Sequence, residues 1–260
     1  MAIWDAAGKF QGLPVHKLLG GKHRSKIPVK ISISGDGIEI DQGIEEARRS
    51  GFSKFKVKVG HGRERDLPRF QRAREILGPN TFIGADANGG WTFDEAEHCI
   101  DFLKSLECAF IEQPVAKDLL DQMAELNLTS GLPVIADESV FSLDDARRCI
   151  ELDAADGVSV YIGKSGGLDL AMKISQLCAE ANVDVIIGSN AELGIGTAAQ
   201  IHVAAAISTL GKIPSDIIGH HFYTDDIIEN SNHIDGTFAY VSDEPGLGVT
   251  PRPDIVERLQ

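Results

Sequence analysis

The sequence of 260 residues has little of what marks secretion, membrane insertion or nucleic-acid binding. No apolar run approaches the roughly 20 residues that cross a bilayer, and the N-terminus lacks the pattern of a signal peptide. Basic residues are few, 25 against 39 acidic ones, and the net charge of −14 argues against a nucleic-acid partner. The four cysteines are widely spaced and include no CxxC pair: Cys99, Cys108, Cys149 and Cys178. We therefore expect buried free thiols in a cytoplasmic protein with no membrane partner.

Short apolar runs recur along the chain at a nearly constant spacing, which predicts the fold. One strand, one helix and two short loops fill such a spacing, because parallel strands need a helical crossover between them. Eight runs in a chain of this length favour an α/β barrel of the TIM type. An open doubly wound sheet is the alternative, but it needs an early glycine-rich phosphate turn, which is missing. The runs cover residues 28–34, 55–60, 82–90, 109–114, 133–139, 157–163, 184–190 and 216–222.

The two ends of the chain do not repeat this unit. Residues 1–26 predict a leading helix, over Ala2–Leu19, and a linker into the barrel. The barrel itself is expected over residues 27–235. Residues 236–260 form a C-terminal tail, and its PGLG and PRP sequences predict loops on the surface.

Three of the predicted strands finish in an acidic residue. Asp86 ends FIGAD, Glu112 ends AFIE and Asp137 ends PVIAD, so these acids are one repeat apart. Equivalent positions on neighbouring barrel strands meet at the C-terminal mouth, where barrel enzymes keep their chemistry. Each acid alone could cap the helix that follows it. Three in step favour a cation between them, and oxygen ligands suit Mg²⁺ or Mn²⁺.

Two lysines, Lys56 and Lys58, lie on the strand before the first of these acids. Alternation along a strand directs both side chains to one side, with Phe55 and Val57 on the other. Lysines inside a barrel are unfavourable unless a charge or a substrate engages them. Two of them near a cation should have depressed pKa values, which lets one act as a base near neutral pH. A pair that extends into solvent is the weaker alternative.

Together these motifs resemble the enolase superfamily, and in it the muconate-lactonizing subgroup of the mandelate racemase/muconate lactonizing enzyme family. The similarity runs from AIWDAAGKFQGLPVHKLLGG to PGLG and includes the KxK pair, DANGGW, IEQP and ADES. It implies a (β/α)7β barrel whose three acids, Asp86, Glu112 and Asp137, bind Mg²⁺. It further implies that the metal binds a substrate carboxylate and stabilises the enolate. Lys58 would then remove the α-proton, while Lys56 lowers the pKa of Lys58.

The same resemblance assigns two more positions, Glu192 and Lys164. Glu192, in GSNAELGIG, matches the family's glutamate after the seventh strand. That strand, DVIIGSN, has no histidine, which disfavours the mandelate-racemase subgroup. Lys164 matches the second lysine of a KIxKxGG motif and is expected to contact substrate. From their position near the end of the last apolar run, His220 and His221 are further candidates for contact with substrate, with exposed loop histidines as the alternative.

The chain departs from the family pattern in two respects. Family members carry an N-terminal capping domain over the barrel mouth, and this sequence starts beyond it. We therefore expect the cap to be a missing segment or a separate chain, on which the C-terminal tail packs. The second departure is Tyr161, which stands where relatives with two bases carry a catalytic lysine. A phenol with a pKa of about 10 is a poor base at neutral pH, although it could simply pack against the barrel wall.

The combined reading is a lyase that acts on a small carboxylate. One-base chemistry suits elimination of water from a hydroxy acid or hydroxy amino acid, as in the cis-3-hydroxy-L-proline dehydratase branch. A racemase, epimerase or cycloisomerase of the same family is the second hypothesis. A barrel that binds or assembles without catalysis is the third. We also expect a homo-oligomer.

Overall fold

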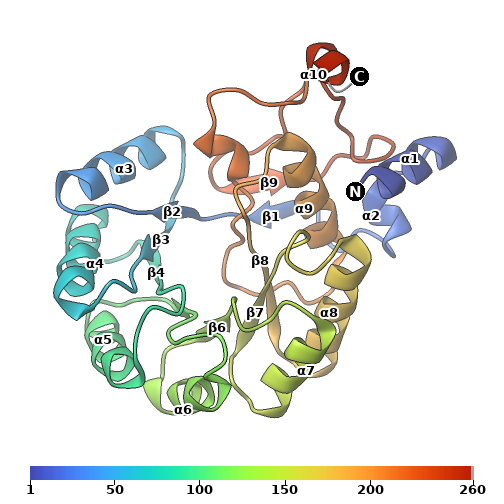
Figure 1. Ribbon diagram of the computed structural model, residues 1–260. Coiled ribbons are helices and arrows are strands. Elements are labelled where there is room, and N and C mark those ends of the chain that lie inside the picture. Colours follow the sequence, from blue (N-terminus) through green and yellow to red (C-terminus); the bar gives the residue numbers. More distant parts are fainter. Residues whose placement is uncertain (259–260) are drawn as a thin grey trace.

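Parallel strands arranged in chain order form the centre of the computed structural model, which describes residues 1–258 (Figure 1). Each strand pairs in parallel with the next, and a helix lies between successive strands along the chain. This confirms the predicted α/β barrel. The strands are β2 (Ile31–Ile33), β3 (Lys54–Lys58), β4 (Phe82–Asp86), β5 (Ile111–Glu112), β6 (Val134–Ala136), β7 (Gly157–Val160) and β8 (Asp184–Ile187).

The prediction of a strand over residues 216–222 is wrong. The 3₁₀ helix η1 (Gly219–Phe222) covers most of these residues. The reason is a close approach of two backbones. A Cβ on Gly219 would lie 2.3 Å from the carbonyl oxygen of Glu192, in the loop after β8. Only a glycine lets the chain pass so close to the backbone of Glu192. From this point the chain turns away from the strands of the sheet.

The barrel nevertheless closes between β8 and β2. The backbone N–H of Asp216 donates to the carbonyl of Ile187 at 2.8 Å, and the N–H of Lys30 donates to the carbonyl of Ser215 at 3.0 Å. The segment around Ser215 therefore takes the place of an eighth strand and brings Asp216 to the barrel interior.

Helices cover the outside of the barrel (Figure 1). Their buried residues follow the helical period, as on the first of them, where Ile40, Ile44 and Ala47 are buried. Thr92 and Ser142 each begin a helix with a capping box, which satisfies backbone N–H groups of the first turn. The helices are α3 (Ile38–Arg49), α4 (Arg63–Leu77), α5 (Phe93–Ser105), α6 (Leu120–Ser130), α7 (Leu143–Glu151), α8 (Leu168–Glu180) and α9 (Gly194–Ala206).

The predicted leading helix is two helices, α1 (Ala2–Gln11) and α2 (Val15–Leu18). Gly12 adopts the left-handed conformation and ends α1, and Pro14 is the residue before α2. The break lets α2 turn and pack against α9.

The C-terminal tail contains more than the predicted loops. Its strand β9 (Phe238–Tyr240) pairs antiparallel with β1 (Lys26–Pro28), and α10 (Pro253–Arg258) follows. The tail is thereby tied to the segment that leads into the barrel. Its packing on a capping domain stays a prediction.

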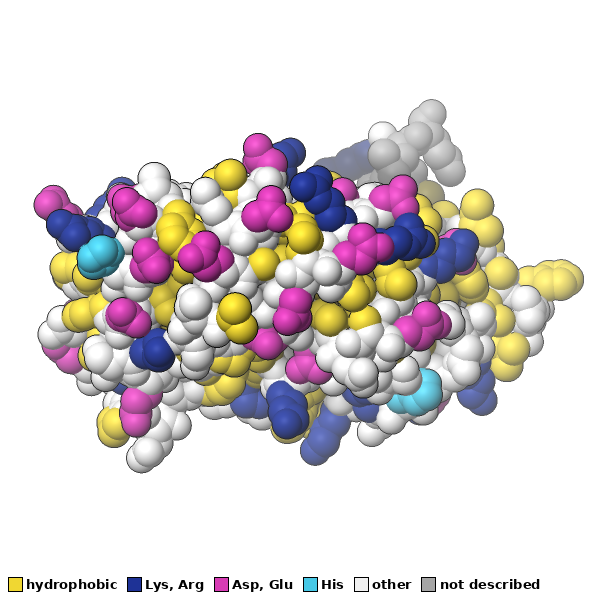
Figure 2. Space-filling model, turned by 90° about the horizontal axis from the view of Figure 1, so that it is seen from below, with side chains coloured by type: hydrophobic (Ala, Val, Ile, Leu, Met, Phe, Trp, Pro, Cys, Tyr) yellow, Lys and Arg dark blue, Asp and Glu magenta, His cyan; other side chains and the backbone are white. Residues whose placement is uncertain are grey.

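All four cysteines are buried and unpaired, as expected. Burial raises the pKa of Cys99, Cys108, Cys149 and Cys178 to about 12. On the face shown in Figure 2, acidic and basic side chains are interspersed with hydrophobic ones. Over residues 1–258, no helix combines the length and the hydropathy needed to cross a membrane.

Candidate active site at the barrel mouth

Lys56 and Lys58 both turn into the barrel, as the alternation along β3 predicts. The register of the sheet places Lys58 beside Asp86, and Asp86 beside Glu112. The ammonium of Lys56 donates to Glu112 Oε2 at 2.8 Å and lies 3.2 Å from Asp86 Oδ2. That of Lys58 donates to Asp86 Oδ2 at 2.6 Å. The Lys56 side chain is 3% exposed and that of Lys58 is 30% exposed, so Lys58 is the more accessible amine.

Two further charged residues belong to this cluster and were missed by the sequence analysis. Asp216 Oδ2 accepts from Lys56 at 3.2 Å and from Lys30 at 2.8 Å. Both Asp216 and Lys30 are buried. The signal that could have found them is a single charged residue inside each of two apolar runs, PVKISIS and SDIIG.

Burial and the surrounding carboxylates act on the pKa of Lys56 in opposite directions. Burial alone would lower the pKa of its ammonium. Three carboxylates, Asp216, Glu112 and Asp86, outweigh burial and raise the pKa of Lys56 well above its ordinary value. A depressed pKa was expected beside a bound cation, whereas the side chains of the protein by themselves shift the pKa of this lysine upward. The surrounding carboxylates therefore favour the charged form of Lys56.

Glu112, the acid of β5 that is predicted to bind metal, has a raised pKa. Burial raises the pKa of Glu112 to about 8, the ammonium of Lys56 opposes the shift, and the Asp86, Asp216 and Asp137 carboxylates add to it. Glu112 Oε1 is buried and has no hydrogen-bond partner. This oxygen is free to accept a cation.

Asp137, just after β6, has different partners from the other two acids. The hydroxyl of Tyr161 donates to Asp137 Oδ2 at 2.6 Å, and Lys164 donates to Oδ1 at 2.5 Å. Lys164 also donates to the carbonyls of Asp137 and Ser159, at 2.8 and 2.9 Å. An ammonium has three N–H groups, so Lys164 has none left for a substrate in this arrangement.

The three acids suit a divalent cation, although a lysine ammonium donates a hydrogen bond to each of them. Among residues 1–258, no three His, Cys, Asp or Glu side chains form a ready metal cluster. The candidate ligands are nevertheless carboxylate oxygens from three neighbouring strands, all buried. Glu112 Oε1 lacks a partner, and hard cations such as Mg²⁺ prefer oxygen ligands. Asp86, Glu112 and Asp137 are therefore suitable ligands.

A cavity of about 250 Å³ opens next to these residues at the barrel mouth. Lys58 and Tyr161 line it from β3 and from the end of β7, which are four strands apart in the sheet. The full lining is Ser32, Ser34, Lys56, Lys58, Tyr161, Ser189, Asn190, Ala191, Asp216, Ile218 and Phe222.

The Tyr161 ring can lie here because residue 188, directly after β8, is a glycine. A Cβ on Gly188 would lie 1.7 Å from Tyr161 Cε1. Burial, and then the carboxylates of Asp137 and Glu112, raise the pKa of the Tyr161 phenol far above its ordinary value. The phenol is therefore protonated and serves as a hydrogen-bond donor.

The remaining predicted residues lie outside this cavity. Glu192 organises the loop after β8, where it accepts from Ser189, from the backbone of Asn190 and from Gln200. His220 lines a separate cavity. His221 packs edge-on against Phe52, with ring centres 5.1 Å apart. A contact of either histidine with substrate stays a prediction.

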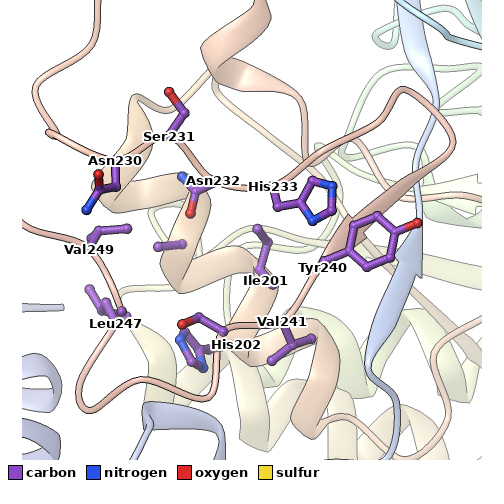
Figure 3. Close-up of a pocket in the computed structure, with 13 residues that line it drawn as sticks. Ile201, His202, Asn230, Ser231, Asn232, His233, Tyr240, Val241, Leu247 and Val249 are labelled. Carbon is purple, nitrogen blue, oxygen red and sulfur yellow. The ribbon is translucent and has the colours of Figure 1, made fainter.

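Another cavity, of about 270 Å³, lies between α9 and the C-terminal tail and contains none of the predicted site residues (Figure 3). His202 lines it from α9, and its Nδ1 lies 3.2 Å from Nδ1 of His16 on α2. Burial lowers the pKa of His202 to about 4. These two imidazoles hold α2 against α9 in their neutral forms.

The chain is similar to several known proteins along most of its length. Residues 39–255 match the family described as enolase C-terminal domain-like. The chain is 30% identical to the N-succinyl-L-Arg/Lys racemase of Bacillus cereus, over all of this chain and 70% of the racemase. It is 32% identical to the cis-3-hydroxy-L-proline dehydratase of Roseibium aggregatum, over 98% of this chain and 69% of the dehydratase. The crystal structure of muconate cycloisomerase from Pseudomonas fluorescens superposes with a TM-score of 0.92 at 29% identity, over 99% of this chain and 72% of that one.

Proposed function

The chain belongs to the enolase superfamily, in its mandelate racemase/muconate lactonizing enzyme family, and we propose that it is a hydro-lyase. The proposed reaction removes the proton α to a carboxylate and then eliminates water from the neighbouring carbon. The substrate class is a small hydroxy acid or hydroxy amino acid, for example cis-3-hydroxy-L-proline.

The proposed cofactor is Mg²⁺, because enzymes of this superfamily generally use a divalent metal. Asp86, Glu112 and Asp137 would hold it. Bound there, the cation would polarise the substrate carboxylate and stabilise the charge that develops on it. The unpartnered Glu112 Oε1 supports this assignment within the chain itself.

Lys58 is the proposed base. Its amine lines the mouth cavity and its side chain is partly exposed, so a substrate there can reach it. Lys56 is unsuitable, because its ammonium is buried among three carboxylates. Its proposed role is to remain charged beside the acids and keep the site from becoming too negative for a carboxylate substrate.

Tyr161 is the observation that carries the proposal. It faces the cavity from the opposite side of the barrel to Lys58 and donates its hydroxyl hydrogen to Asp137. Racemisation needs a base on each face of the enolate, one to remove the proton and one to return it. A phenol, with an ordinary pKa of about 10, is a poor second base at neutral pH. One base and one donor suit proton removal followed by departure of a hydroxyl group.

Epimerisation is the second candidate, since the relatives include a racemase at an identity close to that of the dehydratase. Similarity alone therefore does not decide between the two reactions. The amine of Lys164 lies 4.4 Å from the centre of the Tyr161 ring. It could be a second base only after giving up its hydrogen bonds to Asp137 and Ser159. The elimination reaction needs no such rearrangement.

The test is a screen of β-hydroxy acids and hydroxyprolines with Mg²⁺, in which loss of water is followed by NMR. We expect Lys58→Ala to be inactive and Tyr161→Phe to turn over more slowly without gaining racemase activity. Lys54→Ala, at the other end of β3, is the matched control and should keep wild-type rates. Interconversion of α-epimers without loss of water would replace the lyase proposal with an epimerase.

A further inference from the structure

A continuous chain of ion pairs runs through the barrel and ends at the proposed base. Lys30 and Lys56 share one oxygen, Asp216 Oδ2. Lys56 and Lys58 share another, Asp86 Oδ2. The exposed fraction of the lysine side chains rises along this chain, from 0% for Lys30 through 3% for Lys56 to 30% for Lys58. The buried end of the chain therefore connects with the open mouth through two shared carboxylate oxygens.

Lys30 has no part in the proposed reaction. It does not line the mouth cavity, and its ammonium donates to the carbonyl of Pro214 at 2.6 Å and to Asp216 at 2.8 Å. It also lies 5.5 Å from the centre of the Phe110 ring. Burying a charge is unfavourable, and an apolar side chain of similar length would fill this space without that cost.

The buried charge of Lys30 affects how strongly Asp216 attracts Lys56. The ammonium of Lys56 has carboxylates on two sides, Glu112 Oε2 at 2.8 Å and Asp216 Oδ2 at 3.2 Å. Since Asp216 Oδ2 already accepts from Lys30, its attraction for Lys56 is partly compensated. Without Lys30, Asp216 would be a buried carboxylate with Lys56 as its nearest cation, and it would pull Lys56 toward itself.

We propose that Lys30 is a positioning residue: by sharing Asp216, it keeps the ammonium of Lys56 on Glu112 and Asp86, beside Lys58. It thereby also sets how strongly Lys56 competes with a cation for these two acids. The part of this proposal that concerns catalysis rests on the proposed function. The part that concerns the place of Lys56 does not.

The direct test is the crystal structure of the metal-free protein carrying Lys30→Met, which removes the charge and keeps the length of the side chain. We expect Lys56 Nζ to leave Glu112 Oε2 and to move closer to Asp216. In the double variant Lys30→Met/Asp216→Asn, the competing carboxylate is gone and Lys56 should stay on Glu112. Lys26→Met, an exposed lysine shortly before in the chain, is the control.

A measurement in solution uses Mg²⁺ alone as the probe. If Lys56 leaves Glu112 and Asp86 in Lys30→Met, these acids should bind Mg²⁺ about threefold tighter or more, because a competing cation has withdrawn. At the same time kcat should fall with little change in KM. Tighter metal binding together with slower turnover is a combination that simple loss of structure does not produce. The double variant should not show the tighter binding.

The outcomes separate the two proposals. A wild-type protein that neither exchanges an α-proton nor eliminates water would reject the proposed function, while the position of Lys56 in the metal-free crystals would still decide the role of Lys30. If Lys56 keeps its place in Lys30→Met and Mg²⁺ affinity does not rise, Lys30 is a structural residue only. Should Lys30→Met fail to fold, Lys30→Gln retains an N–H for the Pro214 carbonyl and gives the same comparison.

Discussion

Replacing Asp216 with Asn should destabilise the protein strongly, since two buried ammonium groups depend on it. Lys30 and Lys56 donate to the same oxygen, at 2.8 and 3.2 Å, with exposed fractions of 0% and 3%. Removing one partner of a buried ion pair costs about 3–5 kcal/mol, because the other charge is left uncompensated. For a domain of this size, about 2–4 °C in Tm accompany each kcal/mol, so Tm should fall by about 6–20 °C.

Urea unfolding followed by circular dichroism measures this change, with the midpoint expected to move and the slope to stay constant. The control is Asp243→Asn, because Asp243 is 66% exposed and pairs with Lys22 at the surface. Exposed pairs contribute under about 1 kcal/mol. If Asp216→Asn unfolds within about 1 kcal/mol of the wild type, the buried network does not hold the charges as described.

The remaining predictions concern the histidine pair, the Tyr161 ring and one helix cap. His202 has its pKa lowered to about 4 by burial, so between pH 6.5 and 4 the unfolded chain binds the extra proton and the folded one does not. The free energy of unfolding should therefore fall by about 3 kcal/mol as the pH drops through this range. His202→Gln should remove that part of the pH dependence. If the free energy of unfolding of the variant has the same slope against pH as that of the wild type, this prediction is contradicted. Gly188→Ala should displace the Tyr161 ring, since a Cβ would lie 1.7 Å from it, and should lower activity as Tyr161→Phe does; full activity would show that the ring position is unimportant. Thr92→Ala removes a capping box and should cost about 1 kcal/mol in urea unfolding, and a loss below about 0.3 kcal/mol would mean that water replaces the cap.

The spacing of the apolar runs was enough to predict the barrel, and the acids at the strand ends led to the candidate site at its mouth. Both depend on a regular repeat, which relates a position on one strand to the same position on the next. Lys58 and Asp86 illustrate this, since they are paired in register on β3 and β4. Features whose positions obey this repeat can be predicted from the sequence.

The features that were missed depend on contacts between distant segments. Lys30 and Asp216 meet where the two ends of the sheet close on each other, 186 residues apart in the chain. Gly219 interrupts the last predicted strand because of a backbone from the loop after β8. The raised pKa of Lys56 likewise depends on which acids surround it. One of them, Asp216, is not among the acids that the repeat places at the strand ends.

The assignment of Tyr161 is intermediate between these cases. Its position in the chain, 24 residues after Asp137, follows from the repeat. Its hydrogen bond to Asp137 and its place against Gly188 required the structure. Sequence alone left a packed phenol and a catalytic donor as alternatives, and the structure shows the phenol donating a hydrogen bond to Asp137.

The most direct test of the central claim, one base at Lys58 and none at Tyr161, is the fate of the α-hydrogen in D₂O with Mg²⁺. The enzyme is incubated with a single enantiomer of cis-3-hydroxyproline, and both product and recovered substrate are examined by NMR and chiral chromatography. The account predicts loss of water, with any deuterium in recovered substrate at the α-carbon and its configuration retained, because the proton leaves and returns on the Lys58 face. Recovered substrate that carries deuterium in the inverted configuration would contradict it, since a second base must then act from the Tyr161 side.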